Sequence, residues 1–181
     1  TTARGRVVYA AMGDGSAHLL TRGHGRPGAG AWRGEREATL LDGGAPFYRT
    51  YETADGGYMA VGAIEPQFFA QLLAGLDLRA DEVPGQFDRE RHPEMRRLFT
   101  ERFASRTRAE WTEVFAGTDA CVTPVLTWTE AARSEHLLAR RTLIEVGGTE
   151  QAAPAPRFSR TSPGPVGTPP QVTTALDEIG W

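Results

Sequence analysis

The stretch LLDGGAPFYRTYETADGGYMAVGAIEPQFF, residues 40–69, decides how the centre of this chain folds. Residues 47–53 alternate bulky and polar side chains, which is typical of a half-buried strand. The following Ala-Asp-Gly-Gly, residues 54–57, predicts a hairpin turn, because Asp-Gly readily adopts the left-handed conformations that such turns need. Residues 58–64 then form the returning strand. Pro66 starts a helix at its first position, where the missing N–H costs nothing.

Helical spacing of apolar residues follows the hairpin. We expect helices over 65–76 and 93–106, each with one apolar face. Thr107 and Glu110 have the spacing of a capping box, which predicts the start of a third helix. A short buried strand is expected over 120–125. These elements together predict an α+β fold.

The segments on either side are less regular. Apolar spacing over 4–21 predicts a helix that glycines weaken, and the glycine-rich segment 21–37 predicts a loop or linker. After the centre, residues 129–141 are expected to be helical with a break at Ser134, which could cap a second segment. A strand is expected over 143–146.

The end of the chain is rich in proline and glycine. Gly147 and Gly148 predict a turn after the last expected strand. From residue 152 to residue 170 we expect an extended arm, because proline cannot continue a helix. A last helical turn is expected over 174–179.

Composition and charge limit the class of protein. The chain has 181 residues, of which 40% are hydrophobic and 24% charged, as in ordinary globular proteins. A formal net charge of −3 gives no reason to expect nucleic acid as a partner, and no apolar run suggests a membrane partner. The four histidines lack the spacing of metal ligands, so no metal site is expected.

Cys121 is the single cysteine, so no disulfide can form within the chain. This fits a reducing compartment, and we expect a cytoplasmic protein. Because Cys121 lies in the apolar segment 120–125, we expect it in the core and not as a nucleophile.

Five motifs occur along the chain: LDGGAPFY at 41–48, YETADGGYMAVGAIEPQFF at 51–69, HPEM at 92–95, DACVTPVL at 119–126 and APRFSRT at 155–161. In this order and at this spacing they resemble the α-methylacyl-CoA racemases, within the wider group of family III CoA transferases (CaiB/BaiF type). A single motif would be weak evidence. Together they make the resemblance extend over about residues 4–162, which corresponds to the C-terminal half of such proteins.

The resemblance implies a division of the chain. Residues 39–150 would form the small α+β domain of the family, with its hairpin and helices. Residues 1–38 would be the last helix of a large domain and a linker, and residues 151–181 an extended tail that returns to that domain. In related proteins the large domain is Rossmann-like, binds coenzyme A and lies mostly in the N-terminal half.

A partner chain follows from the same resemblance. Related chains are longer and form interlocked dimers, in which each active site uses the large domain of one subunit and the small domain of the other. The first helix here has no sheet to pack on within the chain. We therefore expect a racemase-like N-terminal-half chain as partner, in a heteromer or interlocked dimer.

The chemistry of the racemases is a proton transfer at the carbon α to a thioester, with a histidine and an aspartate as bases. A base is needed on each face of that carbon, because inversion removes the proton on one side and returns it on the other. The family's aspartate lies in the pattern V-V-D-A-x-M, which matches residues 7–12 here. Tyr9 stands in its place, early in the expected helix. The histidine lies upstream of the matching region.

Glu94 in HPEM matches the glutamate that supports the family's histidine. The resemblance therefore implies Tyr9 and Glu94 as the catalytic positions. Tyrosine has an ordinary pKa of about 10, so it is a poor base at neutral pH but a good hydrogen-bond donor. Asp14, five residues on, is an additional acidic residue and not a relocated base. From the residues alone, Tyr9 is as well explained by packing and Glu94 by the helix dipole.

Substrate contacts are implied for Tyr48, Met59 and Glu65, because the hairpin region approaches the acyl chain in the family. The residues alone favour core packing for Tyr48 and Met59. No cofactor is expected, and a coenzyme A thioester is the expected substrate.

Three functions remain open. The first is the C-terminal subunit of a split racemase-like isomerase, restricted to one-base chemistry by Tyr9. The second is a repurposed biosynthetic enzyme that acts on a substrate other than a CoA ester. The third is a non-catalytic subunit that completes the fold or site of a partner.

Overall fold

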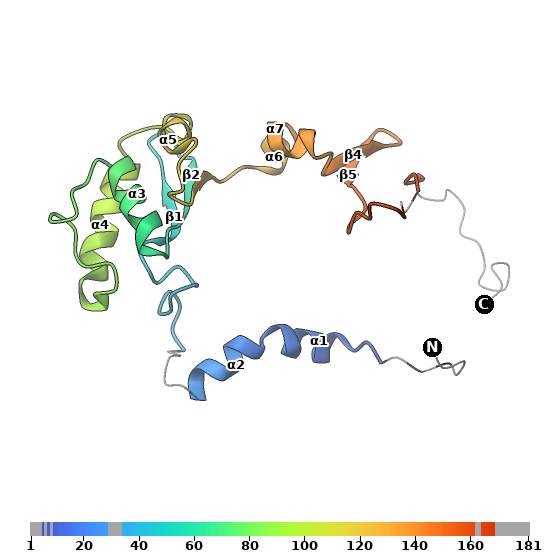
Figure 1. The fold of residues 1–181 in the computed structure, drawn as a ribbon, viewed down its shortest axis with the longest axis horizontal. Coiled ribbons are helices and arrows are strands. Elements are labelled where there is room, and N and C mark those ends of the chain that lie inside the picture. The colour runs from blue at the N-terminus through green and yellow to red at the C-terminus, as the bar shows by residue number, and fades with distance from the viewer. Residues whose placement is uncertain (1–4, 6, 8, 29–33, 162–163, 169–181) are drawn as a thin grey trace. The chain divides into compact units, whose positions relative to one another are not determined.

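A computed structural model of the chain describes residues 5, 7, 9–28, 34–161 and 164–168 (Figure 1). The chain divides into two units, residues 1–125 and residues 126–181. The domain limits expected from the resemblance, at residues 38 and 150, stay predictions.

The hairpin forms as expected at the centre of the first unit. Strand β1 (Tyr48–Glu52) pairs antiparallel with β2 (Tyr58–Gly62). Gly56 in the turn has φ of 75°, a left-handed conformation that glycine adopts without steric cost. Strand β3 (Val122–Pro124) pairs antiparallel with β2, so the sheet has the order β1-β2-β3.

Three helices pack with this sheet. They are α3 (Pro66–Gly75), α4 (His92–Phe103) and α5 (Arg108–Phe115), and a 3-10 turn, η1 (Arg89–Arg91), leads into α4. Their apolar faces meet the inward side chains of the strands in one core, whose largest fully buried members are Phe47, Met59, Leu72, Leu76, Met95, Phe99, Phe103 and Trp111. The α+β class expected from the sequence is confirmed.

Local signals set the beginnings of these helices. Pro66 occupies the first turn of α3, as predicted. The Thr107 side chain accepts from the Glu110 N–H at the start of α5, while the Glu110 carboxylate accepts from the Thr107 N–H, which completes the predicted capping box.

The N-terminal segment differs from the expectation. Helix α1 (Met12–Leu19) begins only after Ala11, whose extended backbone (ψ 131°) separates Tyr9 from the helix. The expected loop over 21–37 contains a second helix, α2 (Thr21–Gly28), because i→i−4 hydrogen bonding resumes directly from the His24 N–H to the Leu20 carbonyl. Glycine lowers helix propensity, but each residue added to an existing turn gains a hydrogen bond.

The second unit begins with two short helices, α6 (Trp128–Ala132) and α7 (Glu135–Ala139). The predicted break at Ser134 is confirmed, since this residue is the N-cap of α7, although its side chain makes no capping hydrogen bond. Thr127 forms a capping box with Glu130 that the sequence reading missed.

Strand β4 (Leu143–Val146) was expected, but its partner β5 (Thr149–Ala152) was not. The two pair through the predicted turn, where Gly147 and Gly148 have φ of 59° and 79°. Thr-Glu-Gln-Ala lacks the apolar alternation of a strand, so β5 depends on hydrogen bonding to β4. The predicted helical turn at 174–179 lies outside the described residues.

The expectation that Cys121 lies in the core was wrong. It precedes β3, has φ of 53° and is exposed. The positive φ turns its side chain away from the core, and the neighbouring Ala120 and Val122 are buried instead. In the described residues no helix has the length and apolar character that crossing a membrane requires.

Candidate functional site

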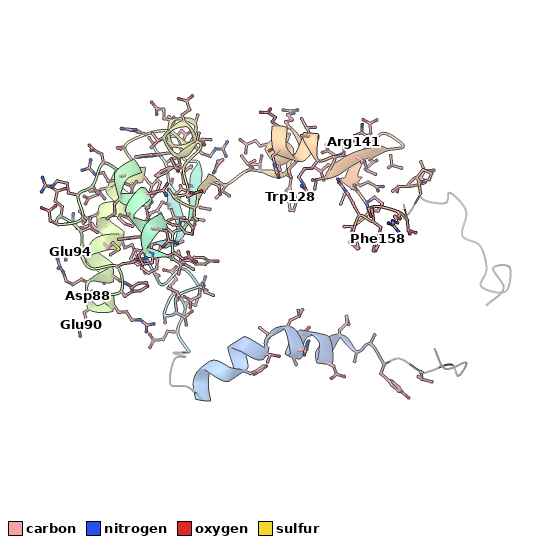
Figure 2. All side chains as sticks on the ribbon, in the orientation of Figure 1. Asp88, Glu90, Glu94, Trp128, Arg141 and Phe158 are labelled. Carbon is pink, nitrogen blue, oxygen red and sulfur yellow. The ribbon has the colours of Figure 1, made fainter. Side chains whose placement is uncertain are left out.

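Glu94 lies in the first turn of α4, where its charge complements the helix dipole. Arg91 precedes the helix and holds this carboxylate with two hydrogen bonds, from Nε to Oε2 at 3.0 Å and from Nη2 to Oε1 at 3.0 Å. Figure 2 shows Glu94 near one end of α4, together with Asp88 and Glu90. The side chain of Glu94 is 43% exposed, so a further polar group can reach it.

A cavity of about 480 Å³ lies beside this end of α4. Its size is within the range of small-molecule sites, which is roughly 300–1,000 Å³. The apolar part of the wall consists of Ala38, Leu40, Ala45, Phe47, Phe87 and Pro93. The charged part consists of Glu35, Arg36, Glu37, Arg89, Glu90 and Arg96. Such a wall suits a ligand with an apolar body and a polar end.

Two arginines behind the cavity share one carboxylate. Arg49 on β1 and Arg96 on α4 each place Nη1 at 3.3 Å from Oε2 of Glu37. Arg49 also donates to the carbonyl of Gly43, and Arg96 to that of Gly44. This cluster joins the chain segment before the hairpin to both the sheet and α4, and so shapes the cavity wall.

Tyr51 lies next to these arginines inside the core. Its hydroxyl donates to the carbonyl of Pro46 at 2.6 Å, and its ring stacks on Phe103. Burial raises the pKa of Tyr51 far above its ordinary value, although Arg49 and Arg96 lower it in part. The phenol therefore remains neutral and acts as a structural hydrogen-bond donor.

The three predicted substrate contacts fall in different places. Tyr48 is half-buried and lines a shallow groove on the outer face of the sheet together with Cys121. Glu65 is exposed at the N-cap of α3. Desolvation raises the pKa of the Cys121 thiol, and the charges of Glu65 and Asp119 raise it further.

Met59 is fully buried in the core, on the opposite face of the strand from this groove. Tyr9 is 89% exposed and lies in the extended segment before α1, where Asp14 occupies the first helical turn. The catalytic roles of Tyr9 and Glu94, and the substrate contacts of Tyr48, Met59 and Glu65, stay predictions.

Sequence reasoning missed Arg91, Glu37 and the arginine pair Arg49 and Arg96. The spacing of Arg91 and Glu94 is that of neighbours on a helix, and this signal was available. Glu37 and Arg96 are far apart in the sequence, and no local pattern indicates that they meet. No group of three potential metal ligands gathers among the described histidine, cysteine and carboxylate side chains.

Known proteins resemble this chain over most of its length. It is 48% identical over 159 residues to α-methylacyl-CoA racemase of Mus musculus, a match that covers 87% of this chain and 42% of the mouse protein. It is 48% identical over 143 residues to α-methylacyl-CoA racemase of Homo sapiens, with 79% and 37% covered. The chain thus spans about two fifths of the length of these relatives.

A solved structure shares the fold. The crystal structure of Rv3272 from M. tuberculosis superposes with a TM-score of 0.67 at 19% identity, covering 89% of this chain and 42% of that one. The sequence model of CoA-transferase family III matches residues 1–174 of this chain. With this match and the racemase relatives, the chain belongs to CoA-transferase family III.

Proposed function

We propose that this chain is the C-terminal part of an isomerase that moves the proton at the carbon α to an acyl-CoA thioester. The observation that carries the proposal is the 48% identity over 159 residues with a protein named α-methylacyl-CoA racemase. The substrate class is an acyl-CoA branched at that carbon, because such a thioester carries a weakly acidic proton at a stereocentre.

Glu94 and Tyr9 have distinct roles in this proposal. Glu94 supports the base that removes the α proton, and its partly exposed carboxylate has room for that contact. Tyr9 replaces the second base, and its hydroxyl donates a hydrogen bond to the thioester carbonyl, where negative charge develops as the α proton leaves. One-base chemistry at this centre exchanges the proton readily and inverts the centre slowly.

The cavity beside α4 is the proposed surface for the acyl group. Phe47, Phe87 and Leu40 supply an apolar wall that extends to Pro93 in the first turn of α4, which suits a branched hydrocarbon chain. The CoA portion would be bound by the part of the assembly that corresponds to the other three fifths of the racemases.

A partner with an N-terminal-half racemase fold, or a preceding segment of the same polypeptide, is proposed to supply that part. Native mass spectrometry of the protein purified untagged from its source tests this. A second polypeptide related to the racemase large domain supports a heteromer. A single longer polypeptide supports a continuous chain. A chain without either contradicts the proposed isomerase.

The activity is tested with the assembly as purified, by incubating a 2-methylacyl-CoA in D₂O and following α-deuterium uptake by NMR. We expect exchange in the natural protein and a loss on the order of 100-fold in Glu94→Gln, the scale of a positioned acid or base. Glu101→Gln is the matched control, because Glu101 is also on α4 and also pairs with an arginine, Arg97. Equal exchange in both variants would remove the role given to Glu94.

Tyr9 itself favours a second candidate, in which the chain completes a partner's fold or acts on a different substrate. Ligand binding, deuterium exchange and thermal protection together separate these possibilities. A complex that binds acyl-CoA but exchanges no deuterium supports a non-catalytic subunit. Thermal protection by a non-CoA biosynthetic compound, without protection by CoA, supports a repurposed enzyme.

A further inference from the structure

We infer that Arg91 is a positioning residue for Glu94, which it holds in one orientation for its part in proton transfer. This inference rests on the proposed function of Glu94. It concerns a side chain outside both the sequence predictions and the proposed mechanism, and it follows from the geometry at the start of α4.

Local hydrogen bonding fixes the backbone of Arg91, from which its side chain extends to Glu94. Residues Arg89–Arg91 form the 3-10 turn η1, and the Arg91 N–H donates to the Asp88 carbonyl at 3.2 Å. Pro93 then restricts the chain as it enters α4. The guanidinium therefore starts from a fixed point, three residues before the carboxylate that it binds.

The contact with Glu94 is a planar fork. Nε and Nη2 of Arg91 each donate to a different oxygen of Glu94 at 3.0 Å. Two parallel hydrogen bonds set the rotation of a carboxylate as well as its position, which a single contact does not do. Each oxygen keeps a lone pair free, so Glu94 can still accept a hydrogen bond from a catalytic group.

Stability alone does not account for this pair. Both side chains are about half exposed, at 54% for Arg91 and 43% for Glu94, and ion pairs in such surroundings contribute little to folding. A cation at the N-terminal end of a helix also opposes the helix dipole. What the pair supplies is a defined orientation of Glu94 in the first turn of α4.

The same helix carries a natural comparison. Arg97 pairs with Glu101 one turn of helix further along, through a single hydrogen bond from Nη1 to Oε1 at 2.7 Å. Both residues are exposed. Arg97→Gln therefore removes a comparable surface charge and ion pair without touching Glu94.

The experiment measures kcat and KM for α-deuterium exchange in the natural assembly, for Arg91→Gln, Arg91→Lys, Arg97→Gln and Glu94→Gln. We expect Arg91→Gln to lower kcat about tenfold with KM within twofold, because binding is intact while the base is less well oriented. Arg91→Lys is expected to fall between, since lysine keeps the charge but lacks the fork. Arg97→Gln is expected to match the natural protein.

The double variant Arg91→Gln with Glu94→Gln shows whether Arg91 acts through Glu94. We expect it to be no slower than Glu94→Gln alone, because residues that act as a unit are not additive. A further tenfold loss would overturn the inference, and so would an effect of Arg91→Gln on KM alone or one equal to that of Arg97→Gln.

Two results separate this inference from the proposed function. If Glu94→Gln is slow while Arg91→Gln matches Arg97→Gln, the proposed function stands and the positioning role fails. If the natural assembly shows no α-deuterium exchange, or if Glu94→Gln exchanges as fast as the natural assembly, the proposed function fails and the inference fails with it. A high-resolution crystal structure of Arg91→Gln gives an activity-independent readout: Glu94 spread over several rotamers is expected, and one unchanged rotamer would overturn the inference.

Discussion

A guanidinium nitrogen of Arg96 lies 3.3 Å from the carboxylate of Glu37, across 59 positions of sequence. The same carboxylate oxygen accepts from Arg49 on β1. One half-exposed glutamate therefore offsets two arginines, one on the sheet and one on α4. Both Nε atoms are buried, and no hydrogen-bond partner is found for either among the described residues, so these guanidinium groups depend on Glu37 and on two glycine carbonyls.

The first prediction concerns this cluster. Glu37→Gln leaves Arg49 and Arg96 facing each other without a counter-charge, and we expect a loss of about 1 kcal/mol in the free energy of unfolding. Urea denaturation measures it, and the loss is expected to shrink in 1 M salt because screening weakens the repulsion. Asp81→Asn, in the exposed pair with Arg79, is the control and is expected to leave the urea midpoint unchanged. Equal midpoints for both variants would contradict the role of Glu37.

The aromatic core gives a second prediction. Phe99 on α4 is fully buried and contacts the rings of Tyr51 and Phe69. Phe99→Ala leaves a cavity and is expected to cost about 3–5 kcal/mol of unfolding free energy. Phe87 is 60% exposed, and Phe87→Ala is expected to cost about 1 kcal/mol or less on the same urea measurement. Similar losses in the two variants would show that the core is not centred on α4.

Close packing between α3 and α5 gives a third prediction. A Cβ atom built on Gly75 would overlap the ring of Phe115, whereas one built on Gly85 would make only an ordinary contact with Asp88. We therefore expect Gly75→Ala to cost about 1–3 kcal/mol through overpacking. Gly85→Ala is expected to be close to neutral. Thermal unfolding measures both, and a stable Gly75→Ala variant would show that α3 and α5 can separate.

The capping box of α5 gives a fourth prediction, on pH. Hydrogen bonds from the backbone N–H and then from the side chain of Thr107 lower the pKa of Glu110 below its ordinary value of 4.5. A lowered pKa in the folded state means that the contribution is complete above 4.5 and is lost as pH falls through the lowered pKa. The stability advantage of the natural chain over Glu110→Gln is therefore expected at pH 7 and absent in strong acid, as measured by urea denaturation.

The control for the capping box of α5 is Thr100, a threonine within α4. Thr107→Ala is expected to cost about 1 kcal/mol through loss of the cap. Thr100 is exposed within α4 and donates to the Arg96 carbonyl, so Thr100→Ala is expected to be neutral or slightly stabilising. A pH-independent difference between the natural chain and Glu110→Gln would show that the carboxylate does not cap α5.

Tyr9 gives a fifth prediction, which rests on the proposed function. Tyr9→Asp places a carboxylate where the related racemase pattern has one, and we expect inversion of the α centre to rise on the order of 100-fold. Tyr9→Phe removes only the hydroxyl and is expected to lower exchange. Tyr58→Phe is the matched control, because Tyr58 is an exposed tyrosine of β2. A Tyr9→Asp variant without any gain would contradict a base at this position.

Local chemistry made much of the centre predictable. Asp55 and Gly56 determine the hairpin turn, and Thr107 determines the start of α5. The alternation of exposed Thr50, buried Tyr51 and exposed Glu52 in β1 follows from alternating side chains. Each of these features depends on residues a few positions apart, so the sequence alone contains the physical cause. The family resemblance depended in the same way on short motifs that can be read directly.

Other features depended on hydrogen bonds or contacts that no local pattern announces. Helix α2 forms despite its glycines because hydrogen bonding continues from Leu20, and β5 exists because β4 offers it a partner. Cys121 was placed in the core by its apolar neighbours, yet a positive φ exposes it. In each case a backbone interaction outweighed the side-chain pattern.

The candidate site likewise contains residues that the sequence indicates and contacts that only the folded structure shows. The sequence by itself determined which residues stand at the positions of interest, Tyr9 and Glu94, because these follow from motif matches. The pairing of Arg91 with Glu94 is local, at a spacing of three residues, whereas only the tertiary structure decided that Glu37 joins two arginines beside a cavity. The physical reason is that a carboxylate selects its arginine by distance and orientation in space, which are set only when α4 packs on the sheet.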